Sequence, residues 1–265
     1  MTASAILLVL AASLLHAAWN ARTHAGGDPR AILAGSYVVA AAMFAPWVIL
    51  EPPWSAWPLI LLAGLIHGLY LWALSGAYGS AALASTYPIA RGSAPLLVAV
   101  FGIWVLGQTP SSPTIAGAVA VATGLLLIGN VALGRGERRG LSMALLTGCF
   151  IAGYTLVDAK GAEEVGGLGF FAVTAVLGAV VVVVLGRVSA DRLRAAAREA
   201  VIVGLVANSA YGLILLAYTR GDAANVATLR ATSILFGLVL VRRTVTRRLT
   251  TGALLVVAGS ILVSL

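Results

Sequence analysis

Apolar segments of about 20 residues recur along the whole chain, separated by charge clusters and by breaks that contain proline or glycine. A helix needs about 20 apolar residues to cross a hydrocarbon core of about 30 Å. Ten such segments cover residues 3–21, 31–50, 57–76, 81–106, 114–133, 140–159, 167–186, 199–218, 223–241 and 250–264. They use nearly the whole chain, so the connections are short. We therefore predict an all-α integral membrane protein with ten transmembrane helices.

Charged residues are scarce and unevenly placed. Only 10% of the 265 residues are charged and 60% are hydrophobic, whereas soluble domains carry about 25% charged residues. We number each connection by the segment that it follows. The odd-numbered connections contain these basic residues: Arg22, Arg30, Arg135, Arg138, Arg139, Arg187, Arg192, Arg194, Arg198, Arg242, Arg243, Arg247 and Arg248. The even-numbered connections hold only Lys160 and Arg220. This bias predicts a multi-pass protein of the cell (plasma) membrane with both termini on the outer side, and it accounts for the net charge of +8 without a nucleic-acid partner.

The two halves of the chain echo each other. HGLYLWAL at residues 67–74 is similar to YGLILLAY at 211–218, and LASTYPIARGSAPLL lines up with NVATLRATSILF when Arg91 is set opposite Arg230. Each half then has five segments, and an odd number gives the second half an inverted orientation, as in many secondary transporters. We predict two five-helix inverted repeats, residues 1–133 and 140–265.

Three stretches at matching positions carry a family resemblance. LLHAAWNA near the start, YPIARGSAPLLVAVFGIWVLG in the fourth segment and ATLRATSILFGLVL in the ninth resemble the EamA-like branch of the drug/metabolite transporter superfamily. The resemblance implies two EamA-like repeats around a central cavity lined by the first, third, fourth, sixth, eighth and ninth helices. It also implies secondary transport of small metabolites. The chain departs from the family pattern at Gly107, Gln108 and Thr109, where a Gly-Glu-Arg-like run is common, and its ninth segment is about one turn short.

Arg91 is the residue that most suggests a binding site. It lies about ten residues into its segment, roughly the middle of the bilayer at about 1.5 Å per residue. A charge at that depth costs ~2.5–3.5 kcal/mol on insertion scales, so it should face a wet cavity or a partner. The flanking Pro88, Gly92 and Pro95 predict a broken helix, at which the guanidinium could bind a carboxylate or phosphate. The alternative is an arginine that binds carbonyls freed by the kink.

Arg230 and the deep histidines complete the candidate polar groups. Arg230 lies seven residues into its shorter segment and could line the cavity or snorkel to the interface. None of the nine acidic residues lies at mid-segment, and Asp158, near the end of 140–159, comes closest. Two arginines without an opposing carboxylate favour an anionic substrate. His67 and His16 are then the candidates for proton coupling, the alternative being hydrogen bonds between helices.

Aromatic and amide side chains at similar depth complete the predicted site. His16, Trp19 and Asn20 share a helix stripe, and in the repeat alignment Tyr154 matches Trp19 and Tyr211 matches His67. Packing or interface roles are the alternative. The predicted substrate-binding residues are Arg91, His67, Tyr87, Arg230, Tyr211, Trp19, Asn20 and Tyr154.

We predict a secondary transporter that moves a small polar metabolite, anionic or zwitterionic, by alternating access, and not an enzyme. A membrane-embedded enzyme acting on lipids or prenyl phosphates would need clustered carboxylates or histidines, and no phosphate loop or metal motif such as HExxH or CxxC is present. A structural membrane scaffold is the other alternative. No cofactor or metal is expected. The expected partners are the lipid bilayer, a small-molecule substrate and a coupling proton, in a monomer or homodimer.

Overall fold

The computed structural model describes residues 1–78, 83–129, 138–240 and 246–262, and within these ranges it leaves out the side chains of residues 83–89, 92, 128–129, 138–139, 141 and 238–240. The first half contains α1 (Ala3–Ala25), α2 (Pro29–Leu50), the short 3₁₀ helix η1 (Trp54–Ala56), α3 (Trp57–Tyr78), α4 (Leu83–Val105) and α5 (Ser112–Gly129). The second contains α6 (Arg138–Val165), α7 (Gly167–Gly186), α8 (Ala190–Tyr218), α9 (Ala223–Arg230), α10 (Ser233–Leu240) and α11 (Arg247–Leu262).

Every regular element of the described residues is helical, which confirms the all-α class. Within the described ranges, nine of the ten expected segments each form one helix, and the ninth is divided into α9 and α10. In this part of the chain six helices, among them α1, α6 and α8, are long and apolar enough to cross a membrane. The full set of ten crossings stays a prediction.

Two helices of the second half extend beyond their apolar segments. α8 begins at Ala190, where Ser189 caps it by accepting from the Arg192 amide, and α6 continues to Val165. Charged residues at a membrane surface remain helical when caps satisfy the end groups. As a consequence, Asp158 lies within α6 and not near its end.

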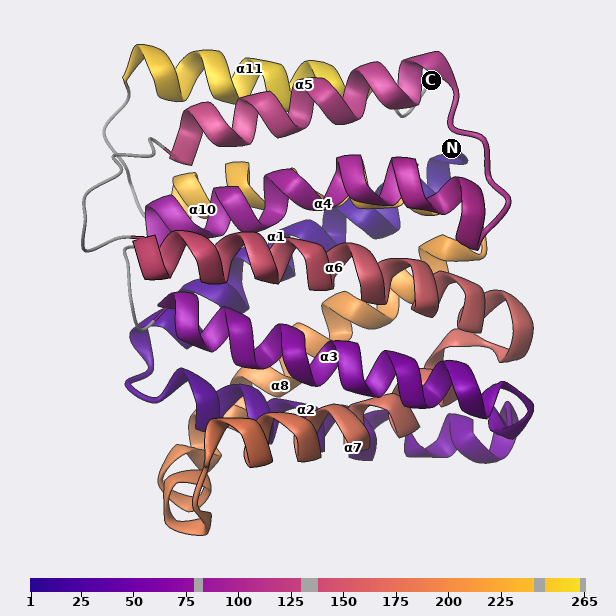
Figure 1. The fold of residues 1–265 in the computed structure, drawn as a ribbon, viewed down its shortest axis with the longest axis vertical. Helices are drawn as coiled ribbons and strands as arrows, with labels where there is room; N and C mark the ends of the chain where they lie inside the picture. The colour runs from indigo at the N-terminus through magenta and orange to yellow at the C-terminus, as the bar shows by residue number, and fades with distance from the viewer. Residues whose placement is uncertain (79–82, 130–137, 241–245, 263–265) are drawn as a thin grey trace.

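The halves pack mainly against each other (Figure 1). α2 packs on α7 and α8, α3 on α6 and α7, α4 on α6, α1 on α8, and α5 on α11. The α5–α11 contact is close: a Cβ at Gly124 would lie 2.5 Å from the Gly252 carbonyl oxygen. Small residues such as glycine permit this approach between membrane helices. The buried core therefore lies between the halves.

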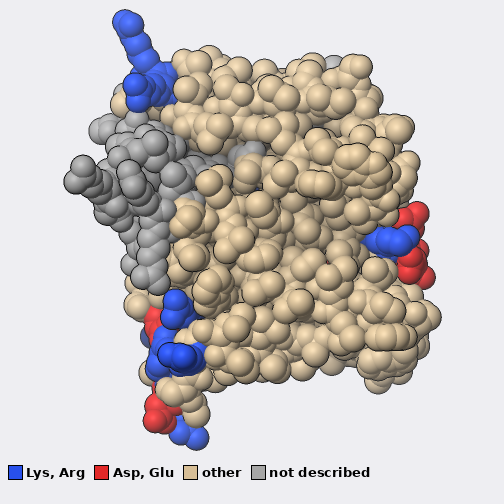
Figure 2. Space-filling model, viewed as in Figure 1, with Lys and Arg blue, Asp and Glu red and all other residues tan. Residues whose placement is uncertain are grey.

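Charge on the visible face gathers at two opposite edges of the molecule, and a broad uncharged surface separates them (Figure 2). The helices run across this surface from edge to edge, and both ends of the chain are marked at the same edge (Figure 1). Large apolar side chains such as Ile49 and Leu7 are exposed on the helices. This pattern is that of a lipid-facing belt.

Two ion pairs join the halves where α1, α2 and α8 meet. Arg22 Nε lies 2.8 Å from Glu199 Oε2, and Arg192 Nε lies 2.7 Å from Asp28 Oδ2. The hydrogen-bonded Arg192 guanidinium lowers the pKa of Asp28 below its ordinary value. These pairs are partly exposed, so each contributes only about 0–1 kcal/mol.

Candidate functional site

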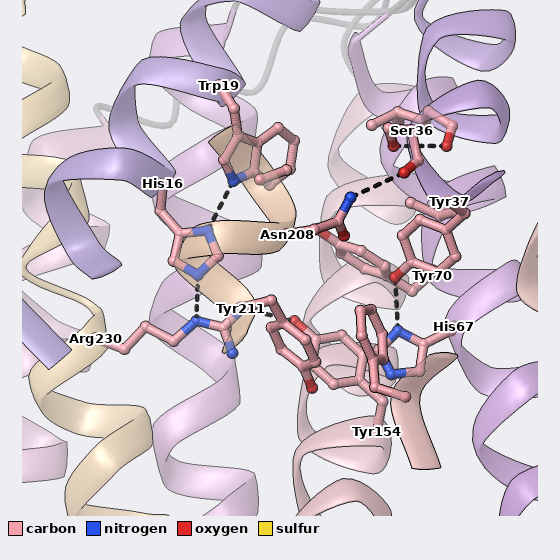
Figure 3. A pocket seen from close by; sticks show the side chains of 14 residues that line it. His16, Trp19, Ser36, Tyr37, His67, Tyr70, Tyr154, Asn208, Tyr211 and Arg230 are labelled. Carbon is pink, nitrogen blue, oxygen red and sulfur yellow. Dashed lines mark hydrogen bonds between the residues drawn. The ribbon is translucent and has the colours of Figure 1, made fainter. Parts of the chain in front are cut away.

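A small buried cavity lies between the two halves (Figure 3). Its volume of about 30 Å³ holds one or two water molecules and is too small for a metabolite. The lining comes from α1, α2 and α3 of the first half and α6, α7, α8 and α9 of the second. The lining residues are His16, Trp19, Leu33, Ser36, Tyr37, His67, Tyr70, Leu71, Tyr154, Phe171, Ala207, Asn208, Tyr211 and Arg230.

Arg230 stands at the division between α9 and α10. The amides of Ala231 and Thr232 donate to the carbonyls three residues back, as in a 3₁₀ turn. Ser13 Oγ, from α1, donates to the Arg230 carbonyl at 3.3 Å, and Thr232 Oγ1 donates to the Leu229 carbonyl at 2.8 Å. Side chains therefore satisfy backbone oxygens at a break that contains neither proline nor glycine.

The Arg230 guanidinium is buried against α1, α6 and α8. Its Nε donates to His16 Nε2 at 3.1 Å, and one terminal nitrogen donates to Tyr154 Oη at 3.1 Å. Its central carbon lies 5.4 Å from the ring centre of Tyr211 and 5.8 Å from that of Tyr154, within cation–π range. Snorkelling is thus excluded, and among the described residues its hydrogen-bond partners are uncharged groups.

His16 is approached by donors at both ring nitrogens. Trp19 Nε1 lies 2.7 Å from Nδ1, and Arg230 Nε lies on the other side (Figure 3). The Trp19 contact confirms the predicted stripe on α1. A neutral imidazole offers one acceptor nitrogen, so one tautomer satisfies only one of these two donors.

A second polar cluster surrounds His67. Tyr37 Oη lies 2.7 Å from Nδ1, and Asp158 Oδ2 lies 2.7 Å from Nε2. Tyr211 Oη donates to the same carboxylate oxygen. Asp158 is 0% exposed, and its Oδ1 has no hydrogen-bond partner within the described ranges. The expectation that no carboxylate lies deep in the protein is therefore wrong, because α6 extends past the apolar window that set its predicted end.

The structure brings most predicted site residues together. His67, Arg230, Tyr211, Trp19, Tyr154 and His16 all line the cavity. Asn20 does not: its amide donates to the His16 carbonyl at 2.7 Å, and its oxygen accepts from Tyr78 Oη. The side chain of Tyr87 lies outside the described residues.

Arg91 is buried, at 4% exposure, but it is absent from the cavity lining. It acts electrostatically on His16, and α4 runs without interruption from Leu83 to Val105. The predicted break at Arg91 is therefore wrong. Membrane helices tolerate proline and glycine when neighbouring helices support the freed backbone groups.

Several residues in or beside the cavity lining were not predicted as site residues from the sequence. Asn208 donates to the Ser36 carbonyl at 2.8 Å and lies three residues before Tyr211 on α8. Asp158 lies four residues after Tyr154 on α6. Spacings of three and four place such residues on one helix face, so both could have been inferred from the aromatic positions. Tyr37 had no such signal, because α2 was not expected to contribute to the cavity.

The arrangement supplies a fixed cation, aromatic walls and a histidine–carboxylate pair. Within the described part of the chain, no group of three or more His, Cys, Asp or Glu side chains is placed to bind a metal. The chemistry available is anion binding and proton binding.

An uncharged helical belt around two packed halves is the pattern of a multi-pass membrane protein, and the family comparison adds the transporter class. The model of the EamA-like transporter family matches twice, over residues 3–130 and 138–265. The chain belongs to this family, within the drug/metabolite transporter superfamily. A solved crystal structure of a protein with 19% sequence identity matches with a TM-score of 0.72, covering 100% of this chain and 98% of that one, which shows a shared fold. Comparison with curated proteins gave no match.

Proposed function

We propose that this protein is a secondary transporter of a small anionic or zwitterionic metabolite, moved across the cell membrane by alternating access. Arg230 carries the proposal, since it is a permanent cation in a cavity between the halves. A guanidinium has five N–H donors, and His16 and Tyr154 accept from two of them. The remaining donors can bind a carboxylate or phosphate bidentately.

The closed cavity fits a cycle in which the site is occluded between two open states. A volume of about 30 Å³ admits no metabolite, so entry requires the halves to separate on one side. In the inverted-repeat arrangement proposed here, rocking one half against the other would expose Arg230 to each side in turn. The break between α9 and α10, at which Arg230 stands, is our candidate hinge for that motion.

Binding and flux measurements test the proposal. We would screen the purified protein by thermal shift with glutamate, succinate, lactate, inorganic phosphate and glucose 6-phosphate, using glucose as the uncharged comparison. A ligand at 100 times its Kd stabilises the folded state by ~2.7 kcal/mol. We expect at least one anion to raise the melting temperature and to be transported into proteoliposomes.

The variant Arg230→Gln should lose both the shift and the flux. Arg220→Gln is the matched control, because Arg220 is exposed and its guanidinium donates to the nearby Leu216 carbonyl, away from the cavity lining. If Arg230→Gln retained binding and transport, Arg230 would not be the anion-binding residue, and the proposed anion site would be wrong.

A further inference from the structure

We propose that Asp158 and His67 together form a proton-binding site, and that an anion bound at Arg230 is carried with the proton held there. This inference rests on the proposed transport function. It gives a role to Asp158, the buried carboxylate that was not predicted as a site residue from the apolar segments.

The contacts of His67 suit both protonation states of its ring. In the neutral ring with hydrogen on Nε2, that N–H donates to Asp158 Oδ2, and Nδ1 accepts from the Tyr37 hydroxyl. When Nδ1 also gains a proton, the Tyr37 hydroxyl can rotate and accept, because a phenol is both donor and acceptor. The resulting imidazolium is hydrogen-bonded to a carboxylate, the pairing that stabilises its charge.

His16 lacks this freedom, although the sequence also made it a candidate for proton coupling. Its two nitrogens face Trp19 Nε1 and Arg230 Nε, both obligate donors. If His16 were protonated, each of its ring N–H groups would face another N–H, that of Trp19 or that of Arg230. The ring would also add a second positive charge beside Arg230. Of the two deep histidines, His67 is therefore the proton carrier.

Asp158 is shielded from direct contact with a substrate. It is fully buried and absent from the cavity lining, and it meets the cavity only through His67 and Tyr211. A proton can reach it through Tyr37 and His67, both of which line the cavity, whereas a metabolite cannot. Asp158 thus holds the proton in place on His67 and does not bind the substrate.

The charges of the site explain why anion and proton would travel together. Among the groups at the cavity, Arg230 contributes one positive charge and Asp158 one negative charge, and these balance when His67 is neutral. Arg91 acts on His16 from outside the lining. A monovalent anion at Arg230 would leave one negative charge that no group of the lining compensates, which is costly in a low-dielectric interior. One proton from water, taken up at Nδ1 of His67, restores the balance. Coupling is reciprocal, so acidification should tighten anion binding.

The other groups that face the pair do not compete for this proton. Tyr37 comes from α2 and Tyr211 from α8, and both donate to the pair. Tyr154 of α6 stacks on the His67 ring at 4.4 Å between centroids, and Phe171 of α7 packs beside it without a titratable group. Arg230 of α9 keeps its charge and reaches the pair only across the aromatic rings of Tyr154 and Tyr211.

Proton flux driven by an anion gradient tests the inference. Proteoliposomes containing the full-length protein and the pH dye pyranine would receive external glutamate, succinate or inorganic phosphate, which cross lipid poorly when charged. We expect internal acidification at one proton per transported anion, because His67 takes up a single proton. In Asp158→Asn, an amide oxygen in the place of Oδ2 can still accept from His67 and Tyr211 but has no negative charge to stabilise a protonated His67. Anion exchange between equal pools should therefore survive while proton flux falls at least tenfold. Glu164→Gln, an exposed position on the same helix, should behave as the unmodified protein.

Each outcome separates this inference from the transport proposal. Proton flux that persists in Asp158→Asn, or anion flux without protons in the unmodified protein, would overturn the proton site and leave the transporter intact. If none of the three anions moves, the transport proposal fails, and infrared difference spectra between pH 5 and pH 8 still decide the site. A titrating His67–Asp158 signal that Asp158→Asn removes supports it, and its absence from the unmodified protein overturns it.

Discussion

The two arginines that the repeat alignment pairs have opposite surroundings. Arg91 lies in an uninterrupted α4 despite Pro88, Gly92 and Pro95 around it, and it is buried away from the cavity lining. Arg230 stands at the α9–α10 break, where the sequence has no proline or glycine, and it lines the cavity. The comparison teaches that a membrane helix divides where side chains of other helices satisfy its backbone, and not simply where helix-breaking residues occur.

Lysine substitutions at the two positions should produce the largest contrast. Arg230→Lys keeps the charge but loses the planar fork that contacts His16 and Tyr154. A hydrogen bond to a charged group contributes ~1.5–3 kcal/mol, so the affinity for the most stabilising anion of the thermal-shift panel should fall about 10- to 150-fold. Arg91→Lys should change that affinity less than about threefold. If Arg91→Lys weakened anion binding as strongly as Arg230→Lys, the conclusion that only Arg230 of the two contacts the anion would be wrong.

Removal of the α1 donor at the break should have an intermediate effect. Ser13→Ala leaves the Arg230 carbonyl without its side-chain donor, and an unsatisfied buried acceptor costs ~1–3 kcal/mol. The free energy of unfolding in detergent, measured with denaturant, reports this change. Ser4→Ala is the matched control, because Ser4 is an exposed serine of the same helix. Equal stability of the two variants would show that the break does not depend on α1.

A partly exposed arginine should give the smallest effect, because solvent screens its ion pair. Arg192→Gln removes the partner of Asp28 and should lower stability by less than about 1 kcal/mol. The pKa of Asp28 is depressed in the folded protein, so this contribution is present above the unfolded pKa, near 3.8, and is lost as the pH falls through the folded pKa. The stability difference between the two proteins should be constant near neutral pH and vanish in acid. A difference that grows on acidification would contradict this assignment.

Local sequence signals predicted the helices and much of the cavity lining. Periodicity placed Trp19 beside His16, and the alignment of the halves placed Tyr154 and Tyr211 in one cavity. The break after Arg230 depends on Ser13, which is 217 residues away in the chain, so no window around Arg230 could reveal it.

The burial of Asp158 was missed for a related reason. Hydropathy marks where a helix leaves lipid, but α6 continues to Val165 and packs against α3 on its way. The carboxylate is kept deep by His67 of α3 and Tyr211 of α8. The carboxylate and its two partners come from three separate helices, so their meeting is a property of the assembled bundle.

Two N–H donors, from Trp19 and Arg230, face the ring of His16, but a neutral imidazole has one acceptor nitrogen. Whichever ring nitrogen carries the proton, either the indole N–H of Trp19 or the Nε–H of Arg230 is left over. A bound ligand that offers an acceptor oxygen to that donor would satisfy it. Ligand binding at this point would therefore complete the hydrogen bonding of Trp19, His16 and Arg230.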